Sequence, residues 1–238
     1  MLELRRSSER GVARVSWLES RHTFSFGSYD DPNQRGFSDL LVINEDRVEP
    51  GAGFELHSHR DVEILTYVLQ GELEHKDTNG KGSVIRPEDV QLMSAGRGIR
   101  HSEFNPSSSD MVHFLQIWIA PQVKGLRPHY QQTHYDPEQG RGRLRLIISP
   151  DGEHGSLSVL QDARVYAGLV DLPQEVMLEL APQRHAYVHV VRGSVDLNGE
   201  PMEAGDGARV RNEPRLFFSS GRAAEVLVFD LRPNELPR

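Results

Sequence analysis

The stretch TYVLQGELE, residues 66–74, contains the pattern that decides the fold of this 238-residue chain. It is rich in apolar and β-branched residues around Gly71, as expected for short strands joined by a tight turn. The stretch VHVVRGSVD, residues 188–196, has the same apolar pattern and places Gly193 at the same position. Two such segments, 122 residues apart, predict two copies of one β unit.

A second pair of similar segments supports this repeat, since PEDV at residues 87–90 resembles AGDG at residues 204–207. No stretch carries a long helical pattern with caps. Other strand-like segments are punctuated by Gly, Pro and Asn; they are Asp61 to Leu69, Met111 to Ala120, Leu144 to Ser149, Tyr187 to Val191 and Ala224 to Leu231. Regular short strands with turns between them predict closed barrels or jelly rolls.

We therefore expect an all-β chain with two barrels. The first is predicted over residues 1–130 and the second over residues 131–238. The segment from about residue 121 to 142 is polar and contains several Pro and Gly residues, so we expect it to link the two halves.

Composition narrows the class of protein. The chain has 37% hydrophobic and 26% charged residues, as ordinary globular proteins do. It has neither an apolar run of membrane-spanning length nor an apolar signal core after its first residues, so we expect a cytoplasmic protein. The net charge of −8, without a long basic run, argues against direct binding to nucleic acid. Because cysteine is absent, any metal must be held by His, Asp or Glu.

Two short pairs supply such ligands, His57 with His59 and His101 with Glu103. The i, i+2 spacing of each pair places both side chains on one face of a strand. Each pair alone is close to a chance occurrence, but both are flanked by turn-forming glycines. Two neighbouring strands would then direct three imidazoles and one carboxylate at one ion, a ligand set that suits iron, manganese, nickel or zinc.

The second half lacks these ligands. The positions that correspond to the two pairs carry Glu179, Ala181, Phe218 and Ser220. His185 and His189 fall at other positions of the repeat, so we expect one metal, in the first half only.

Several other side chains have ordinary structural interpretations. Phe114 and Trp118 share a strand face and are predicted to pack in the core, with pocket lining as the alternative. Phe24 and Phe26 also share a face, for which core packing is favoured over covering a barrel mouth. His75 is expected to be an ordinary core or surface histidine.

Two motifs resemble those of a known family. Residues 51–71, GAGFELHSHRDVEILTYVLQG, resemble the first motif of the cupin superfamily. Residues 93–105, MSAGRGIRHSEFN, resemble the second motif in its pirin form, and WLESRHTFSF at residues 17–26 and QIWI at residues 116–119 add support. The resemblance covers essentially the whole chain. It implies a bicupin, with two double-stranded β-helix barrels and one divalent metal in the N-terminal barrel.

The resemblance also implies the ligand set. In most cupins the glutamate of the first motif binds the metal, but Glu63 stands one residue early when counted from Gly71. In pirins the glutamate of the second motif takes that place. The metal ligands implied are therefore His57, His59, His101 and Glu103. Glu63 is then expected behind the ligands or on the surface.

Bacterial members of this family are described as quercetin 2,3-dioxygenases, which implies an enzyme that opens the central ring of a flavonol with O₂ and releases carbon monoxide. The expected ion is Fe²⁺, with Mn, Ni, Cu, Co or Zn as alternatives. Glu103 would accept the flavonol hydroxyl proton, or act only as a ligand. The alternative function is a non-enzymatic, metal- or redox-sensing regulator that binds a protein partner, as in eukaryotic pirins. A barrel stabilised by a structural zinc is a third reading. We expect a monomer that does not associate with membranes.

Overall fold

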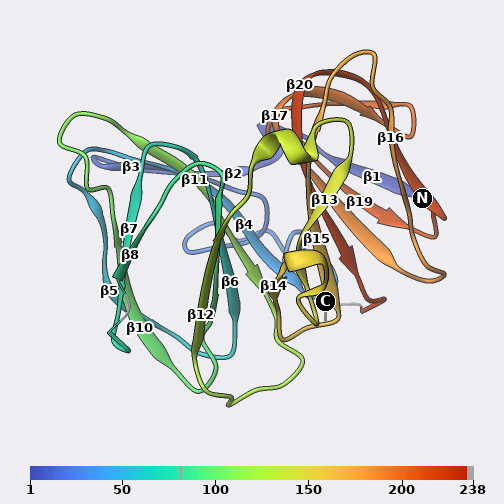
Figure 1. Ribbon diagram of the computed structural model, residues 1–238. Helices are drawn as coiled ribbons and strands as arrows, with labels where there is room; N and C mark the ends of the chain where they lie inside the picture. Colours follow the sequence, from blue (N-terminus) through green and yellow to red (C-terminus); the bar gives the residue numbers. More distant parts are fainter. Residues whose placement is uncertain (81, 235–238) are drawn as a thin grey trace.

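The computed structural model describes residues 1–80 and 82–234 and confirms the all-β, two-barrel prediction. The two barrels lie side by side (Figure 1). In the described ranges the only helices are three short 3₁₀ helices, namely η1 (Ser7–Glu9), η2 (Pro137–Gly140) and η3 (Glu153–Gly155).

The first barrel consists of a seven-stranded and a four-stranded sheet. The larger sheet has the order β12-β9-β6-β11-β4-β3-β2, and the smaller has the order β5-β10-β7-β8. The strands are β2 (Gly11–Val15), β3 (Leu18–His22), β4 (Leu40–Val48), β5 (Gly53–His59), β6 (Glu63–Gln70), β7 (Leu73–Asp77), β8 (Gly82–Ile85), β9 (Asp89–Ser94), β10 (Ile99–Phe104), β11 (Val112–Ile119) and β12 (His129–His134).

The second barrel is built from a nine-stranded sheet. Its main path is β1-β19-β17-β20-β15-β13-β14, while β16 pairs with β20 and β18 pairs with β17. The strands are β1 (Leu2–Arg5), β13 (Leu144–Ser149), β14 (Leu157–Ser158), β15 (Ala163–Val170), β16 (Val176–Glu179), β17 (His185–Leu197), β18 (Glu200–Glu203), β19 (Gly207–Arg211) and β20 (Arg215–Leu231).

The chain therefore passes from the second barrel to the first after β1 and returns to the second barrel after β12. Strand β1 lies among the strands of the second barrel, as its blue ribbon beside β19 shows (Figure 1). Strand β12 lies within the segment expected to be a linker and pairs with β9 of the first barrel. The division of the chain at residue 130 stays a prediction.

The repeat is visible in the backbone of the two matched glycines. Gly71 and Gly193 both have positive φ, at 77° and 67°. A Cβ atom at Gly71 would lie 2.8 Å from the carbonyl oxygen of Met111, and one at Gly193 would lie 2.3 Å from that of Ala223. Both positions therefore require glycine, because the backbone is left-handed and a neighbouring strand approaches closely.

The second matched segment forms the same turn in both halves. The side chain of Asp89 accepts a hydrogen bond from the backbone N–H of Arg86 at 3.0 Å. The side chain of Asp206 accepts one from the N–H of Glu203 at 3.1 Å. In each case the aspartate closes a turn that begins three residues earlier.

The interiors of the two barrels differ. In the first barrel, apolar residues form two separate clusters, and on β6 the buried Thr66 stands between Ile64 of one cluster and Val68 of the other. The interior of the second barrel is one continuous apolar cluster, made by Val170, Val176, Leu180, Ala186, Val188, Val190, Val195, Leu197, Met202, Ala208, Val210, Leu216, Phe218, Ala224, Val226 and Val228. Among the described residues, the apolar interior is therefore interrupted by a polar layer in the first barrel and continuous in the second.

A further apolar cluster joins the barrels. It includes Leu65 and Leu115 from the first barrel and Val165, Tyr187 and Phe229 from the second. Because side chains alternate along a strand, the odd-numbered positions of β6, and those of β17 up to Val191, face this inter-barrel core while the even-numbered ones face the barrel interiors.

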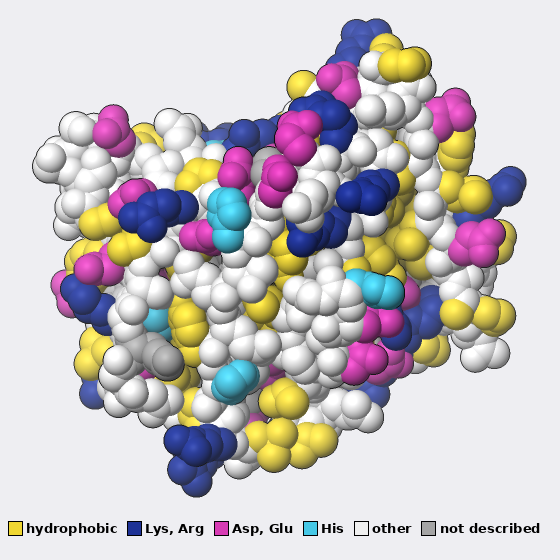
Figure 2. Space-filling model, viewed as in Figure 1, with side chains coloured by type: hydrophobic (Ala, Val, Ile, Leu, Met, Phe, Trp, Pro, Cys, Tyr) yellow, Lys and Arg dark blue, Asp and Glu magenta, His cyan; other side chains and the backbone are white. Residues whose placement is uncertain are grey.

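The surface carries charges of both signs. Figure 2 shows acidic and basic side chains interspersed over one face, with hydrophobic side chains in small groups between them. Over residues 1–80 and 82–234 the structure has no helix long and apolar enough to cross a membrane.

Candidate metal centre

The structure brings three histidines together in the first barrel. Strands β5 and β10 run antiparallel, with His101 opposite His57 and Ile99 opposite His59. The ring of His57 lies 4.4 Å from that of His101 and 4.8 Å from that of His59, and the rings of His59 and His101 are 4.8 Å apart. Their nitrogen atoms lie within 4.8 Å of one another, close enough to share one metal ion.

The free nitrogens of these rings suit a metal. His57 Nδ1–H donates to the carbonyl oxygen of Glu55 at 2.7 Å, which fixes the tautomer and leaves Nε2 available. The buried Nε2 atoms of His59 and His101 have no hydrogen-bond partner within the described chain. A buried polar atom without a partner is costly, and a metal ion at this point would remove that cost.

Burial also keeps two of the rings neutral. It lowers the pKa of His59 to about 4, and the charge of His57 adds to this effect. Burial lowers the pKa of His101 to about 2, with the neighbouring histidines acting in the same direction. Neutral imidazole is the form that binds a metal, so these rings are ready ligands at neutral pH.

Glu103 lies beside this cluster. Its carboxylate forms a second group with His75 and His101, whose ligand atoms lie within 4.8 Å of one another. His101 therefore belongs to both groups of possible metal ligands. The Gln116 amide donates to its two oxygens at 3.1 and 2.9 Å. Burial raises the pKa of Glu103 to about 7, while the Gln116 hydrogen bonds lower it and the charge of Asp46 raises it.

His75 is closer to the site than the sequence indicates. It lies on β7 and is fully buried, and its Nδ1 is 3.3 Å from His101 Nδ1. Its Nε2 is 3.8 Å from a carboxylate oxygen of Asp77, and its ring is 5.1 Å from that of Tyr130. The expectation of an ordinary core histidine is therefore incomplete, because the pairing of β7 with β10 sets His75 directly opposite Glu103.

Aromatic rings line one side of the centre. Trp118 is half-buried, and its ring lies edge-on to His59 at 5.0 Å. Phe26 packs edge-on against Trp118 at 5.3 Å. The core prediction is right for Phe114 and Phe24, which are buried in apolar clusters, whereas Trp118 packs against an apolar cluster on its partly buried side and also contacts His59.

Glu63 does not belong to either group. It is buried on the inter-barrel face of β6 and accepts a hydrogen bond from the hydroxyl of Ser94 at 2.7 Å. Burial raises its pKa, while hydrogen bonds from Ser94 and the backbone of Leu160 lower it. The surface alternative for this residue is wrong, because its odd position on β6 turns it towards the second barrel.

The histidines of the second half lie elsewhere. His185 and His189 are on the face of β17 that carries Tyr187, which packs into the inter-barrel core. The ring of His185 stacks on Phe37 at 5.5 Å. Both groups that could hold a metal in the described residues lie in the first barrel.

Comparisons with known proteins agree with this architecture. The family model described as Pirin matches residues 3–119, and the one described as quercetinase C-terminal cupin domain matches residues 146–231. Quercetin 2,3-dioxygenase of Escherichia coli K12 is 44% identical over 233 residues, which cover 98% of this chain and 100% of the relative. A putative quercetin 2,3-dioxygenase of Pasteurella multocida is 37% identical and covers 97% and 100%.

A solved structure is similar over the same length. The crystal structure of bacterial pirin YhhW from Escherichia coli, in complex with nickel(II), matches with a TM-score of 0.94 and 43% identity. The match covers 98% of this chain and 100% of that one. These matches extend over both barrels, and the chain belongs to the pirin family.

Proposed function

We propose that this protein is a metal-dependent quercetin 2,3-dioxygenase, which opens the central ring of a flavonol with O₂ to give a depside and carbon monoxide. The observation that supports this most directly is the cluster of His57, His59 and His101 beside a buried carboxylate. Relatives that match nearly the whole chain carry that enzyme name.

The three histidines and Glu103 are proposed to hold one divalent ion. The unpartnered Nε2 atoms of His59 and His101 and the oriented ring of His57 fit such a group. When bound, the ion supplies Lewis-acid chemistry, by which it stabilises a deprotonated flavonol oxygen. We infer Fe²⁺ as the native ion, and a monomeric state and a cytoplasmic location likewise stay predictions.

Glu103 is proposed to accept the flavonol hydroxyl proton. A general base works best when its pKa is near the working pH, and burial brings that of Glu103 to about 7. The Gln116 amide holds the carboxylate in place, so that the oxygens keep one orientation. Glu103 thus combines a position beside the histidines with a carboxylate whose pKa is raised by burial.

The aromatic side chains are proposed to orient the substrate. Trp118 and Phe26 form a wall next to His59. Flat aromatic substrates pack well against such rings in edge-to-face or offset geometry. This wall would place a flavonol ring beside the histidine cluster and keep water away from it.

A metal analysis coupled to an aerobic flavonol assay tests this function. Purified protein should contain about one ion per chain, consume O₂ with quercetin and release carbon monoxide. Glu103→Gln should abolish turnover, whereas the control Glu63→Gln changes a buried glutamate of β6 that faces the second barrel, and it should leave turnover intact. Failure of the metal-loaded protein to consume O₂ with any flavonol would overturn the proposal.

A further inference from the structure

A cavity of about 250 Å³ lies where the two barrels meet, away from the histidine cluster. Its walls come from both barrels, with Tyr67 and Leu69 of β6 on one side and Ile147 and Ala167 of β13 and β15 on the other. Tyr67 and Leu69 are at odd positions of β6, so they face away from the interior of the first barrel. Pockets at such interfaces are common ligand sites.

The cavity combines an apolar floor with the positive charge of Arg145, which has no ion-pair partner among the described residues. Buried side chains of the inter-barrel core, Leu69, Val90 and Ile147, contribute to its lining. The guanidinium of Arg145 lies over the ring of Tyr135, with 4.5 Å between its central carbon and the ring centroid. Arg145 is half-buried and donates to the side chain of Gln139, but no described carboxylate lies within ion-pair distance of it.

The other charged groups of the cavity already have partners. Glu225 accepts a hydrogen bond from the Tyr67 hydroxyl at 2.6 Å and lies 3.4 Å from Arg192. At the rim, Asp136 accepts from the backbone of η2 at 3.0 Å, and Glu88 lies 3.6 Å from His134. Arg145 is therefore the charged group of this cavity that is left to bind a ligand.

We propose that this cavity binds a small aromatic carboxylate, independently of the metal centre. The carboxylate would lie against the Arg145 guanidinium, whose planar fork suits two parallel hydrogen bonds. The aromatic body would cover the apolar floor. The cavity has room for one or two fused rings, since a cavity of roughly 150 Å³ holds benzene.

The test uses 1-naphthoate as the probe and calorimetric titration of the full-length protein as the measurement. Its uncharged analogue 1-naphthamide has nearly the same shape and controls for apolar burial. We expect 1-naphthoate to bind one site with equal affinity before and after removal of the metal by a chelator. Arg145→Gln should weaken binding by at least about 10-fold, the loss expected for a charge-assisted pair.

Two further variants make the result specific. Arg143→Gln removes an exposed arginine two residues away and should leave the affinity unchanged. Ala167→Leu fills the cavity from β15 and should abolish binding while the metal content stays the same. Unchanged affinity in Arg145→Gln, equal binding of 1-naphthamide, loss of binding on metal removal, or no binding at millimolar probe would each overturn the proposal. None of these readouts depends on dioxygenase activity, so the two proposals fail separately.

Discussion

The side-chain amide of Gln116 donates to both carboxylate oxygens of Glu103, at 3.1 and 2.9 Å. Gln116 stands on β11 between Phe114 and Trp118, on the strand face that looks into the first barrel. Each oxygen of Glu103 thereby receives a donor inside the barrel, where water is scarce. The amide sets the direction in which the carboxylate can approach the histidines.

Replacing the Gln116 amide should weaken metal binding. Gln116→Leu keeps the approximate volume but removes both hydrogen bonds, and we expect metal affinity to fall about 10-fold or more, as for other residues that orient ligands. Competition with a chromophoric chelator measures this change. Gln131→Leu removes an amide that bonds the backbone of Ser158 and should leave affinity unchanged. Equal affinities in both variants would show that Gln116 does not position the carboxylate.

His101 should be essential for metal binding because it belongs to both groups that could hold an ion. His101→Ala is expected to yield folded protein without metal. His185→Ala, in the second half, should retain the full metal content, since His185 stacks on Phe37 instead. Elemental analysis of the purified variants measures both. Full occupancy in His101→Ala, or loss of metal in His185→Ala, would contradict the placement of the site.

His75 provides a sharper test of the ligand set. If the ion is held by His57, His59, His101 and Glu103, His75→Phe should still bind one ion, because its ring supports His101 without ligating. We expect unchanged stoichiometry and a modest loss of affinity, no more than about 10-fold. Elemental analysis and chelator competition measure the two quantities. Absence of metal in His75→Phe would instead make His75 a ligand, in the group formed with His101 and Glu103.

The sequence shows which half carries the histidines but not all that surrounds them. The His57–His59 and His101–Glu103 spacings place each pair on one strand face, and this depends only on the two-residue period of a strand. His75 comes to Glu103 only through the pairing of β7 with β10, which spacing along the chain does not reveal. The sequence does not give the register between β7 and β10, so it could not place His75 beside Glu103.

The sequence does indicate that Gln116 has a special environment. It is the polar residue at the centre of the alternating positions 114, 116 and 118, whose neighbours on that face are both aromatic. A polar side chain at an otherwise apolar, inward position requires a hydrogen-bond partner. The partner itself lies 13 residues earlier, on a strand of the other sheet, so the sequence could flag Gln116 but not pair it with Glu103.

Strands β17 and β20 are longer than the sequence predicts. The segments predicted at residues 187–191 and 224–231 are confirmed as strand, but the strands continue to 13 and 17 residues. Their pairing contains register shifts near Arg192 and Ser194, where the strands bend. Gly193 and Gly221 interrupt the apolar pattern at these bends, which is why the sequence indicates shorter strands.

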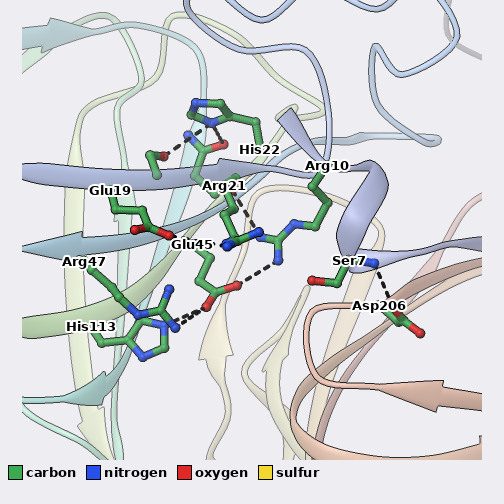
Figure 3. Close-up of polar contacts among 11 residues, drawn as sticks. Ser7, Arg10, Glu19, Arg21, His22, Glu45, Arg47, His113 and Asp206 are labelled. Atoms are coloured by element: carbon green, nitrogen blue, oxygen red, sulfur yellow. Dashed lines mark hydrogen bonds and ion pairs between the residues drawn. The ribbon is translucent and has the colours of Figure 1, made fainter. Parts of the chain in front are cut away.

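A partly buried acid–base network braces the first barrel. Glu45 lies between Arg10, Arg47 and His113, with contacts of 2.8, 2.9 and 2.9 Å (Figure 3). Burial raises the pKa of Glu45, but the hydrogen bond from His113 and the charge of Arg10 outweigh it and hold the pKa well below its usual range. The side chain of Arg10 is fully buried, so Glu45 is its counter-charge.

Removing one partner of this network should be costly. Glu45→Ala leaves the Arg10 charge buried without compensation, and we expect the free energy of unfolding to fall by about 3–5 kcal/mol. The double variant Arg10→Met with Glu45→Leu should recover most of this loss, because no unpaired charge remains. Glu19→Ala removes a partly exposed partner of Arg14 and should cost less than about 1 kcal/mol. Urea unfolding of the four proteins measures these differences, and equal stability of Glu45→Ala and Glu19→Ala would refute the bracing role.

His189 should make the stability of the protein depend on pH. Burial lowers its pKa to about 3 in the folded state, and the charge of Arg10 acts in the same direction. In the unfolded chain a histidine has a pKa of about 6.5, so between about pH 6.5 and 3 the unfolded state binds a proton that the folded state does not. The contribution of His189 is therefore fully present above pH 6.5 and is lost as the pH falls, by about 1.4 kcal/mol per pH unit.

The variant His189→Gln should remove this dependence. Urea unfolding at several pH values from 7 to 4 should show a slope shallower than that of the natural protein by about 1.4 kcal/mol per pH unit. The difference between the two slopes isolates the contribution of His189, since every other residue is the same in both proteins. His154→Gln changes a histidine whose side chain is 81% exposed, and it should reproduce the natural slope. If His189→Gln also reproduced it, His189 would have to take up its proton in the folded state, and the inter-barrel face of β17 would have to admit water.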